Sequence, residues 1–274
     1  MDKPNLNQLT KLTRYSCIDL VGDGVKQFLN GQLTIDTKSI NSEVARLAAL
    51  CNHKGRIVAL FHVLLIENGV RFILPTSTTD AATTHIKKYA VFFKVNVLVN
   101  TCKLYAGLSN ANENSNYIRI ENTDLLLCFE GNRFDANPNE DTDDSFWYSH
   151  LIDKKISWLD QETVEHFLPH YLDLPKLGAI DFKKGCFTGQ EVIARMQYKG
   201  KLKQHLHPLK SQKLASLEAK DKLYQGDKSV GEVVCLLSDA KTGTKLLALV
   251  KDSANLSQQF QTSPENSPIL ELIS

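Results

Sequence analysis

Short hydrophobic segments separated by turn residues run along most of the chain, and they predict strands more often than helices. Residues 15–21 alternate with the period of two that a strand requires. Asn68-Gly69 separates two such segments and favours a hairpin, because both residues tolerate positive φ angles. The expected strands cover residues 15–21, 44–50, 56–66, 70–74, 94–99, 101–107, 117–121 and 125–129.

Helical spacing of apolar residues occurs at fewer places. Ala82, Ile86 and Tyr89 follow the period of an α-helix. The acidic, proline-bearing stretch 135–145 predicts a solvated loop instead. Because helices are interleaved with strands that include hairpins, the pattern predicts an α+β fold rather than a doubly wound sheet. The expected helices cover residues 25–29, 79–89, 146–152, 161–167 and 189–196.

After Gly200 the chain changes to short strands and turns, which is typical of a small β-domain. The length of 274 residues also fits roughly two domains of about 150 residues each. We therefore expect one α+β region over residues 1–200 and a carboxy-terminal β-barrel domain over residues 201–274. The expected barrel strands cover residues 202–209, 222–224, 231–237 and 245–250.

Composition and charge narrow the class of protein. The chain is 42% hydrophobic and 23% charged, which is ordinary for a soluble globular protein. Its net charge of +1 excludes a global electrostatic attraction to nucleic acid or membranes. The amino terminus has no apolar core of signal-peptide length, and the apolar run at 57–66 is too short to span a bilayer. We expect a cytoplasmic protein with no membrane partner.

Six cysteines are scattered through the chain without a CxxC pair or a zinc-type cysteine–histidine spacing. We therefore expect no metal site, and free thiols in a reducing compartment. Five of the cysteines occupy apolar surroundings, and the exception is Cys186. The cysteines are Cys17, Cys51, Cys102, Cys128, Cys186 and Cys235.

Cys186 belongs to the stretch DFKKGCFTGQEVIAR, in which a cysteine precedes an expected helix. Thr188 and Glu191 have the spacing of a capping box, so we expect Thr188 to be the N-cap. A helix amino terminus and the nearby Lys183 and Lys184 favour a reactive thiolate at Cys186. The alternative is that the cysteine only fills a tight turn. No histidine nearby in the sequence supports a papain-like mechanism.

The same region is rich in basic residues. Between residues 181 and 203 there are six lysines and arginines and two acids, a surplus of 6 − 2 = +4. A solvated surface explains most runs of this kind. The alternative is a site for an anionic partner, such as a polyglutamate tail, a phosphate or RNA.

The residues Lys184 to Glu191, KGCFTGQE, resemble the K-G-C-[aromatic]-x-G-Q-E signature of the YgfZ family. These proteins are folate-binding relatives of the glycine-cleavage aminomethyltransferase. Three further segments are similar to family motifs, and the matches cover residues 15–205 in order. They are GQLTID at 31–36, CNHKGR at 51–56 and KKYAVFFKV at 87–95.

This resemblance implies clover-like α+β lobes around a central folate channel, closed by a small carboxy-terminal β-barrel. It implies tetrahydrofolate as cofactor and a role in making or maintaining iron–sulfur proteins, including enzymes that methylthiolate tRNA. Iron–sulfur proteins would then be the clients. The resemblance leaves open whether the protein is an enzyme or a carrier.

The resemblance also implies roles for individual residues. Cys186 would be the reactive residue, with Lys184 beside it and Gln190 and Glu191 at the cofactor. Aromatic residues that contact folate in the family fall near Tyr15 and Trp147. Position 15 carries tryptophan in the relative considered, and a tyrosine face can stack with a smaller area. The alternative for both aromatic residues is a place in the core.

One segment departs from the wider superfamily. The aminomethyltransferases carry acidic residues after the glycine turn, whereas residues 56–61 of this chain offer no carboxylate. Glycine-cleavage activity is therefore not expected, because an apolar strand supplies no general base. A folate-dependent one-carbon transferase is the alternative function, with Asp36 or Glu191 as its carboxylate. Direct tRNA binding is a third hypothesis, and it depends on the basic run alone.

Overall fold

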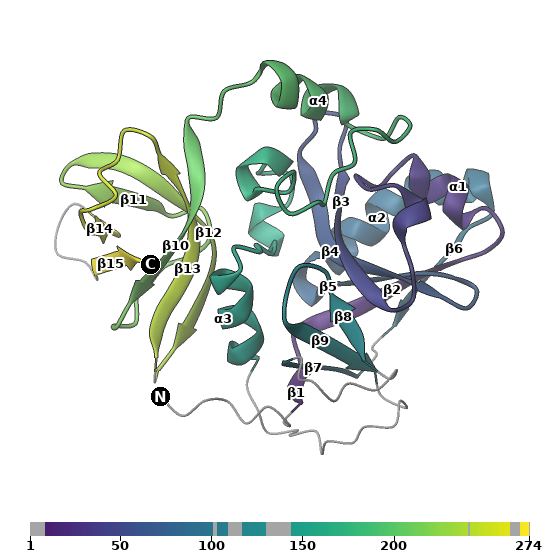
Figure 1. Cartoon of the computed structure of the whole chain (residues 1–274), viewed down its shortest axis with the longest axis horizontal. Coiled ribbons are helices and arrows are strands. Elements are labelled where there is room, and N and C mark those ends of the chain that lie inside the picture. The colour runs from purple at the N-terminus through teal and green to yellow at the C-terminus, as the bar shows by residue number, and fades with distance from the viewer. Residues whose placement is uncertain are drawn as a thin grey trace.

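A mixed sheet and a closed barrel form most of the fold in the computed structural model, and they lie on opposite sides of one helix (Figure 1). The structure describes residues 9–100, 103–108, 117–129, 144–240, 242–263 and 269–273. The predicted α+β class is confirmed.

The sheet has nine strands among the described residues, in the order β1-β7-β9-β8-β3-β4-β5-β2-β6. Only β3 and β8 pair in parallel within this described sheet. The segments predicted as strands are found, and the central strands β2, β3 and β4 bury side chains of both faces in two separate hydrophobic clusters. The strands are β1 Thr10–Leu12, β2 Tyr15–Val21, β3 Val44–Cys51, β4 Ile57–Ile66, β5 Gly69–Pro75, β6 Asn96–Asn100, β7 Leu104–Leu108, β8 Ile118–Ile120 and β9 Leu125–Phe129.

Four α-helices and five short 3-10 turns lie in the described part of the chain. The predicted helix over 161–167 is wrong, since only Gln161–Thr163 is helical, as a 3-10 turn. Glu165 N donates to Ile57 O and Ile57 N donates to Phe167 O, so the backbone there bonds to β4. The α-helices are α1 Val25–Asn30, α2 Thr79–Ala90, α3 Ser145–Asp153 and α4 Gln190–Lys199.

The carboxy-terminal strands close into a barrel in the order β10-β13-β12-β11-β14-β15. Its interior holds aliphatic side chains and Phe260, which is fully buried. The predicted small β-barrel is confirmed, and its first strand begins at Gln204. The strands are β10 Gln204–Ser211, β11 Lys222–Gln225, β12 Lys228–Asp239, β13 Gly243–Lys251, β14 Phe260–Gln261 and β15 Ile269–Leu272.

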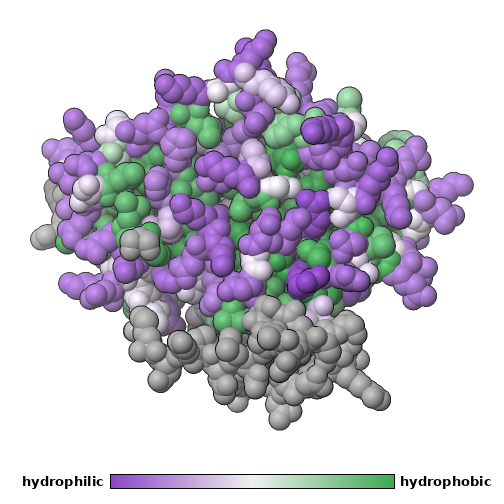
Figure 2. All heavy atoms as spheres, in the orientation of Figure 1, coloured by the Kyte–Doolittle hydropathy of each residue, from purple (hydrophilic) through white to green (hydrophobic). Residues whose placement is uncertain are grey.

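One hydrophobic core joins the barrel to the rest of the chain. Trp147 and Leu151 of α3 belong to the same buried cluster as Val234 and Leu247 of the barrel. At the rim of this contact Lys245 Nζ donates to Asp153 at 3.0 Å. The face shown in Figure 2 carries mainly hydrophilic side chains, with hydrophobic residues interspersed between them.

Several sequence predictions concern single features of the fold. Cys17 is disulfide-bonded, so the prediction that all six cysteines are free thiols is wrong. Most of the acidic stretch 135–145 lies outside the described residues.

No helix in the described part of the chain is long and apolar enough to span a membrane. Within the same residues, no cluster of histidine, cysteine and acidic side chains could hold a metal ion.

Candidate functional site

Helix α4 and the loop before it carry the signature residues. The prediction that Thr188 caps the helix is wrong, because the helix begins at Gln190 and Gly189 is its N-cap, with φ of 81°. The backbone N–H of Thr188 instead donates to Gly31 O, in the segment after α1, at 3.1 Å. Cys186 therefore precedes the helix by one residue more than predicted.

Lys184 anchors this loop to the segment that follows α1. Its side chain is only 8% exposed, and Nζ donates to Asn30 O and Leu33 O, both at 2.6 Å. Burial lowers the pKa of Lys184 to about 8, against the opposing effects of Asp36 and Asp181. The predicted role of Lys184 beside the thiol stays a prediction, whereas its contacts show that it holds the loop in place.

Cys186 is the exposed member of the free cysteines in the described residues. Cys51, Cys128 and Cys235 are buried, and burial raises the pKa of Cys51 and of Cys235 well above the usual range. Their thiols are therefore both shielded and, for these two, harder to ionise. Of these four cysteines in the described residues, only Cys186 has a thiol that a partner can reach from solvent without a change of fold.

The turn between β3 and β4 packs directly against the start of α4. A Cβ at Gly189 would lie 2.5 Å from Asn52 O and 2.9 Å from Gly55 Cα, so the two backbones touch. The Asn52 side chain shapes this turn, since its Oδ1 accepts from Lys54 N at 2.9 Å and Arg56 N at 3.1 Å. Two segments that resemble family motifs therefore form one unit.

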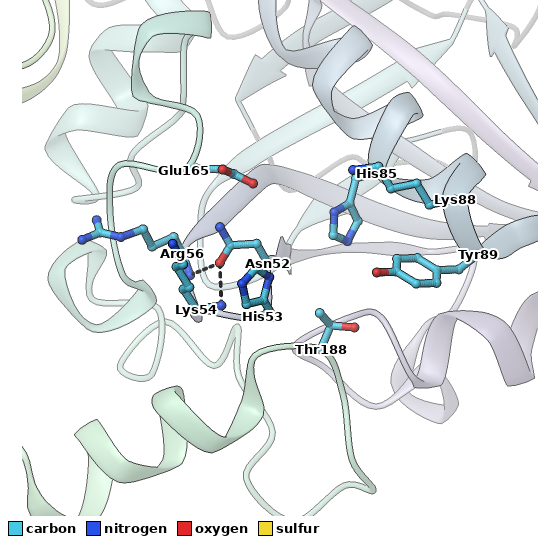
Figure 3. Close-up of a pocket in the computed structure, with 9 residues that line it drawn as sticks. All are labelled: Asn52, His53, Lys54, Arg56, His85, Lys88, Tyr89, Glu165 and Thr188. Atoms are coloured by element: carbon cyan, nitrogen blue, oxygen red, sulfur yellow. Dashed lines mark hydrogen bonds between the residues drawn. The ribbon is translucent and has the colours of Figure 1, made fainter.

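A cavity of about 370 Å³ opens beside this unit (Figure 3). It is bordered by the β3–β4 turn, by α2, by the segment after the 161–163 turn and by the signature loop. Its lining is mainly polar. The lining residues are Asn52, His53, Lys54, Arg56, His85, Lys88, Tyr89, Glu165 and Thr188.

Gln190 and Glu191 form the first turn of α4. Gln190 is partly exposed and Glu191 is exposed. A carboxylate in the first turn is favourable because it lies at the positive end of the helix dipole. Their predicted contacts with a cofactor stay predictions.

Tyr15 and Trp147 lie together in the core, away from the cavity lining. Their ring centroids are 5.8 Å apart in an edge-to-face arrangement, with Trp147 fully buried and Tyr15 7% exposed. Burial raises the pKa of Tyr15 well above its usual value. The structure brings these two predicted residues together.

A buried histidine joins this aromatic pair. His62 lies on β4, with its ring centroid 6.2 Å from that of Trp147. Burial lowers the pKa of His62 to about 4, so the imidazole is neutral at pH 7. Trp147 Nε1 and His62 Nε2 are both buried and have no hydrogen-bond partner within the described residues. His62 is a polar residue in an otherwise apolar strand, and this is the feature of the sequence that could have indicated the site.

Two acidic residues, Asp160 and Glu165, lie near these groups or line the cavity, and no sequence motif indicated either of them. Asp160 accepts from Ser77 Oγ at 3.2 Å, and burial raises its pKa. Glu165 lines the cavity with φ of 58°, a left-handed backbone that side chains rarely adopt. Both follow from tertiary contacts that the residue pattern does not reveal.

The basic run contributes less surface charge than its sequence indicates. Lys184 is buried against carbonyl oxygens, so the exposed bases number five and the surplus falls to 5 − 2 = +3. Direct tRNA binding stays a prediction. The exposed bases are Lys183, Arg195, Lys199, Lys201 and Lys203.

Comparison with known structures defines the class of fold. The chain superposes on the crystal structure of glycine cleavage system aminomethyltransferase T from Bartonella henselae with a TM-score of 0.63 and 14% identity. The match covers 97% of this chain and 85% of that protein. The chain therefore has the fold of an aminomethyltransferase T.

Proteins of similar sequence indicate which proteins with this fold the chain resembles. The chain is 28% identical over 249 residues to a protein of Vibrio atlanticus named tRNA-modifying protein YgfZ, covering 82% of this chain and 76% of the relative. It is 27% identical to the protein of that name from Klebsiella pneumoniae, covering 95% and 86%. No family model matches the chain. The predicted resemblance to YgfZ proteins is confirmed.

Proposed function

We propose that this protein is a folate-binding accessory factor for iron–sulfur proteins, and that it supports tRNA modification through an exposed reactive thiol, Cys186. The relatives named tRNA-modifying protein YgfZ support this proposal. The observation that carries it is the exposure of Cys186 in a loop that Lys184 fixes from beneath. The proposal covers a carrier as well as an enzyme, and it places the protein in the cytoplasm.

The polar groups around Trp147 would pair with those of a pterin ring. The unpartnered indole N–H is a donor, and the His62 ring nitrogen can donate or accept, whereas a pterin presents both acceptors and donors. The rings of Tyr15 and Trp147 add aromatic faces and edges. Trp147, Tyr15 and His62 would therefore hold the pterin, and Gln190 and Glu191 would contact the cofactor from α4. Tetrahydrofolate supplies one-carbon carrier chemistry when it is bound.

The thiol and the folate group have separate positions in this arrangement. Cys186 is exposed on a surface loop, and Trp147 is buried in the shared core. The aromatic group would bind and orient the cofactor, while Cys186 would meet an iron–sulfur client from solvent. Each role can therefore be removed by its own substitution.

Calorimetric titration with tetrahydrofolate tests the cofactor role. Trp147→Phe keeps an aromatic core residue but removes the unpartnered N–H, and we expect about tenfold weaker binding, as for one lost hydrogen bond to a buried group. Trp158→Phe is the matched control, because Trp158 is also buried in the same core cluster, and it should bind within twofold of wild type. Equal affinity of wild type and Trp147→Phe would contradict the folate site.

Complementation tests the thiol role. Cys186→Ala should fold and bind tetrahydrofolate normally but should not restore iron–sulfur enzyme activity in a strain that lacks its YgfZ protein. Cys128→Ala serves as the control, since the Cys128 thiol is buried. Full restoration by Cys186→Ala would remove the thiol from the mechanism.

A one-carbon transferase is the second candidate, and Asp160 favours it. Burial raises the pKa of this carboxyl, and its charge acts on Tyr15 and Tyr148. Asp36 is less suited, because its Oδ1 accepts from Lys38 N as the cap of a 3-10 turn, and Glu191 is exposed. Folate-dependent transfer by purified protein that Asp160→Asn abolishes would support this candidate, and its absence in wild type would exclude it.

A further inference from the structure

The cavity beside the β3–β4 turn has a chemistry that neither the folate proposal nor the thiol proposal uses. We propose that it binds the oxyanion group of a small ligand, a phosphate or a carboxylate, whose remainder also offers a hydrogen-bond donor. The inference requires neither tetrahydrofolate nor Cys186. It depends on three features of the lining.

The first feature is positive charge on two sides of the cavity. Lys54 comes from the β3–β4 turn and Lys88 from α2, and both are exposed. The Arg56 guanidinium is held by the carbonyl oxygen of His166 and points away from the cavity (Figure 3). The two lysine ammonium groups are therefore the cations that can meet an oxyanion in this lining.

The second feature is a set of hydrogen-bonding groups that point into the same space. The Tyr89 hydroxyl and the imidazoles of His53 and His85 point toward its centre (Figure 3). His85 is only 8% exposed, and its Nε2 has no hydrogen-bond partner among the described residues. A buried polar nitrogen without a partner beside a polar cavity indicates a place for a ligand.

The fixed orientation of Asn52 adds a further donor. Because Oδ1 accepts the N–H groups of Lys54 and Arg56, the side-chain amide nitrogen is directed away from the turn. Amide and ammonium donors arranged around one space suit a group with several acceptor oxygens. The turn therefore provides positioning as well as charge.

The third feature is Glu165, an acid in a basic lining. Its φ of 58° is a left-handed backbone conformation that residues other than glycine rarely adopt. The bond from its N–H to Ile57 O at 2.8 Å holds it there, with the carboxylate directed into the cavity (Figure 3). A carboxylate repels an oxyanion but accepts from a hydroxyl or an amine. The ligand therefore needs a donor group in addition to its anionic group.

The volume of about 370 Å³ lies in the range of small-molecule sites, roughly 300–1,000 Å³. Two sources of the anionic group meet these requirements. A mononucleotide offers a phosphate with ribose hydroxyls, and a short glutamate peptide offers carboxylates with amide donors. Adenosine monophosphate and γ-linked triglutamate represent these sources, and inorganic phosphate represents the anion alone.

Calorimetric titration of the full chain with these three probes tests the site. Lys88→Gln should weaken binding of the preferred probe about tenfold. Lys87→Gln is the matched control, because it removes the same charge from the adjacent position of α2 but does not line the cavity, and it should change affinity less than twofold. Equal weakening by both variants, or no saturable binding of any probe to wild type, would overturn the proposal.

Glu165→Gln tests the donor requirement. It should tighten inorganic phosphate, because a repulsive charge is lost, and weaken the preferred donor-bearing probe. Equal tightening of all probes would overturn that requirement. Preference for the mononucleotide or for triglutamate identifies the source, and either result supports the site. Trp147→Phe should leave these affinities unchanged, so this proposal and the folate proposal fail independently.

Discussion

Gly189→Ala is expected to separate the signature loop from the β3–β4 turn. The new Cβ would lie 2.5 Å from Asn52 O and 2.9 Å from Gly55 Cα, and both are backbone atoms that cannot rotate away. The residue also has φ of 81°, where alanine is strained. Gly178 offers a matched control, since it has φ of 71° and no other atom within 4 Å of the position that a Cβ would take.

The two variants divide the cost into strain and contact. A left-handed backbone costs about 1–2 kcal/mol for alanine, and both variants carry this cost. Overpacking costs about 1–3 kcal/mol more, and only Gly189→Ala carries it. We therefore expect Gly189→Ala to lower the free energy of unfolding by about 2–5 kcal/mol and Gly178→Ala by about 1–2 kcal/mol.

Urea unfolding followed by tryptophan fluorescence measures this difference, provided that the m-values agree. Gly189→Ala should also weaken binding of the oxyanion probes, because Asn52 and Thr188 both border that cavity. Gly178→Ala should leave probe binding unchanged. If Gly189→Ala destabilises the protein no more than Gly178→Ala does, the contact between the two backbones is not part of the native structure.

Three further predictions concern titration and reactivity. Burial lowers the pKa of Lys184 from 10.5 to about 8, so the unfolded chain binds more protons than the folded chain between pH 8 and 10.5. The free energy of unfolding of wild type, relative to that of Lys184→Gln, should therefore rise with pH across this window, as measured by urea unfolding. Burial lowers the pKa of His62 from 6.5 to about 4, so wild type should lose about 3 kcal/mol between pH 6.5 and 4, relative to His62→Phe, and parallel pH profiles would contradict this. Iodoacetamide should label Cys186 before Cys51, Cys128 and Cys235 in native protein, as resolved by peptide mass spectrometry, and equal rates would show that the loop does not expose its thiol.

Much of the fold follows from the sequence because its strands are rich in apolar residues that pack into hydrophobic cores. β2 and β9 were predicted with the bounds that they have, since each alternates or packs on a core over its full length. β1 is only three residues long and pairs with β7, so no local pattern could predict it. Short strands of this kind depend on a partner far away in the sequence.

The two errors in the predicted helices share one physical cause. A helix over 161–167 fits local spacing, but bonds to Ile57 draw that backbone onto β4. Thr188 fits the pattern of an N-cap, but the contact of Gly189 with Asn52 moves the cap by one residue. In both places a contact between distant segments determined the backbone.

The candidate site was predicted in part. The signature drew attention to Cys186 and Lys184, but local reasoning could not show that one would be exposed and the other buried. His85 and Glu165 belong to different elements and carry no common motif, so their meeting at one cavity emerges only from the fold. The sequence pattern could not reveal residues that come together only in the folded chain.

Helix α3 has consequences for how the chain can be divided. It contacts β12 and β13 on one side, and Trp147 shares its cluster with residues of the sheet region. A fragment that ended near residue 200 would leave the barrel side of Trp147 and Leu151 open to water. Such a fragment would lose the packing that fixes Tyr15 and Trp147, so the carboxy-terminal strands would be the outer wall of the proposed folate site, although they contribute no signature residue to it.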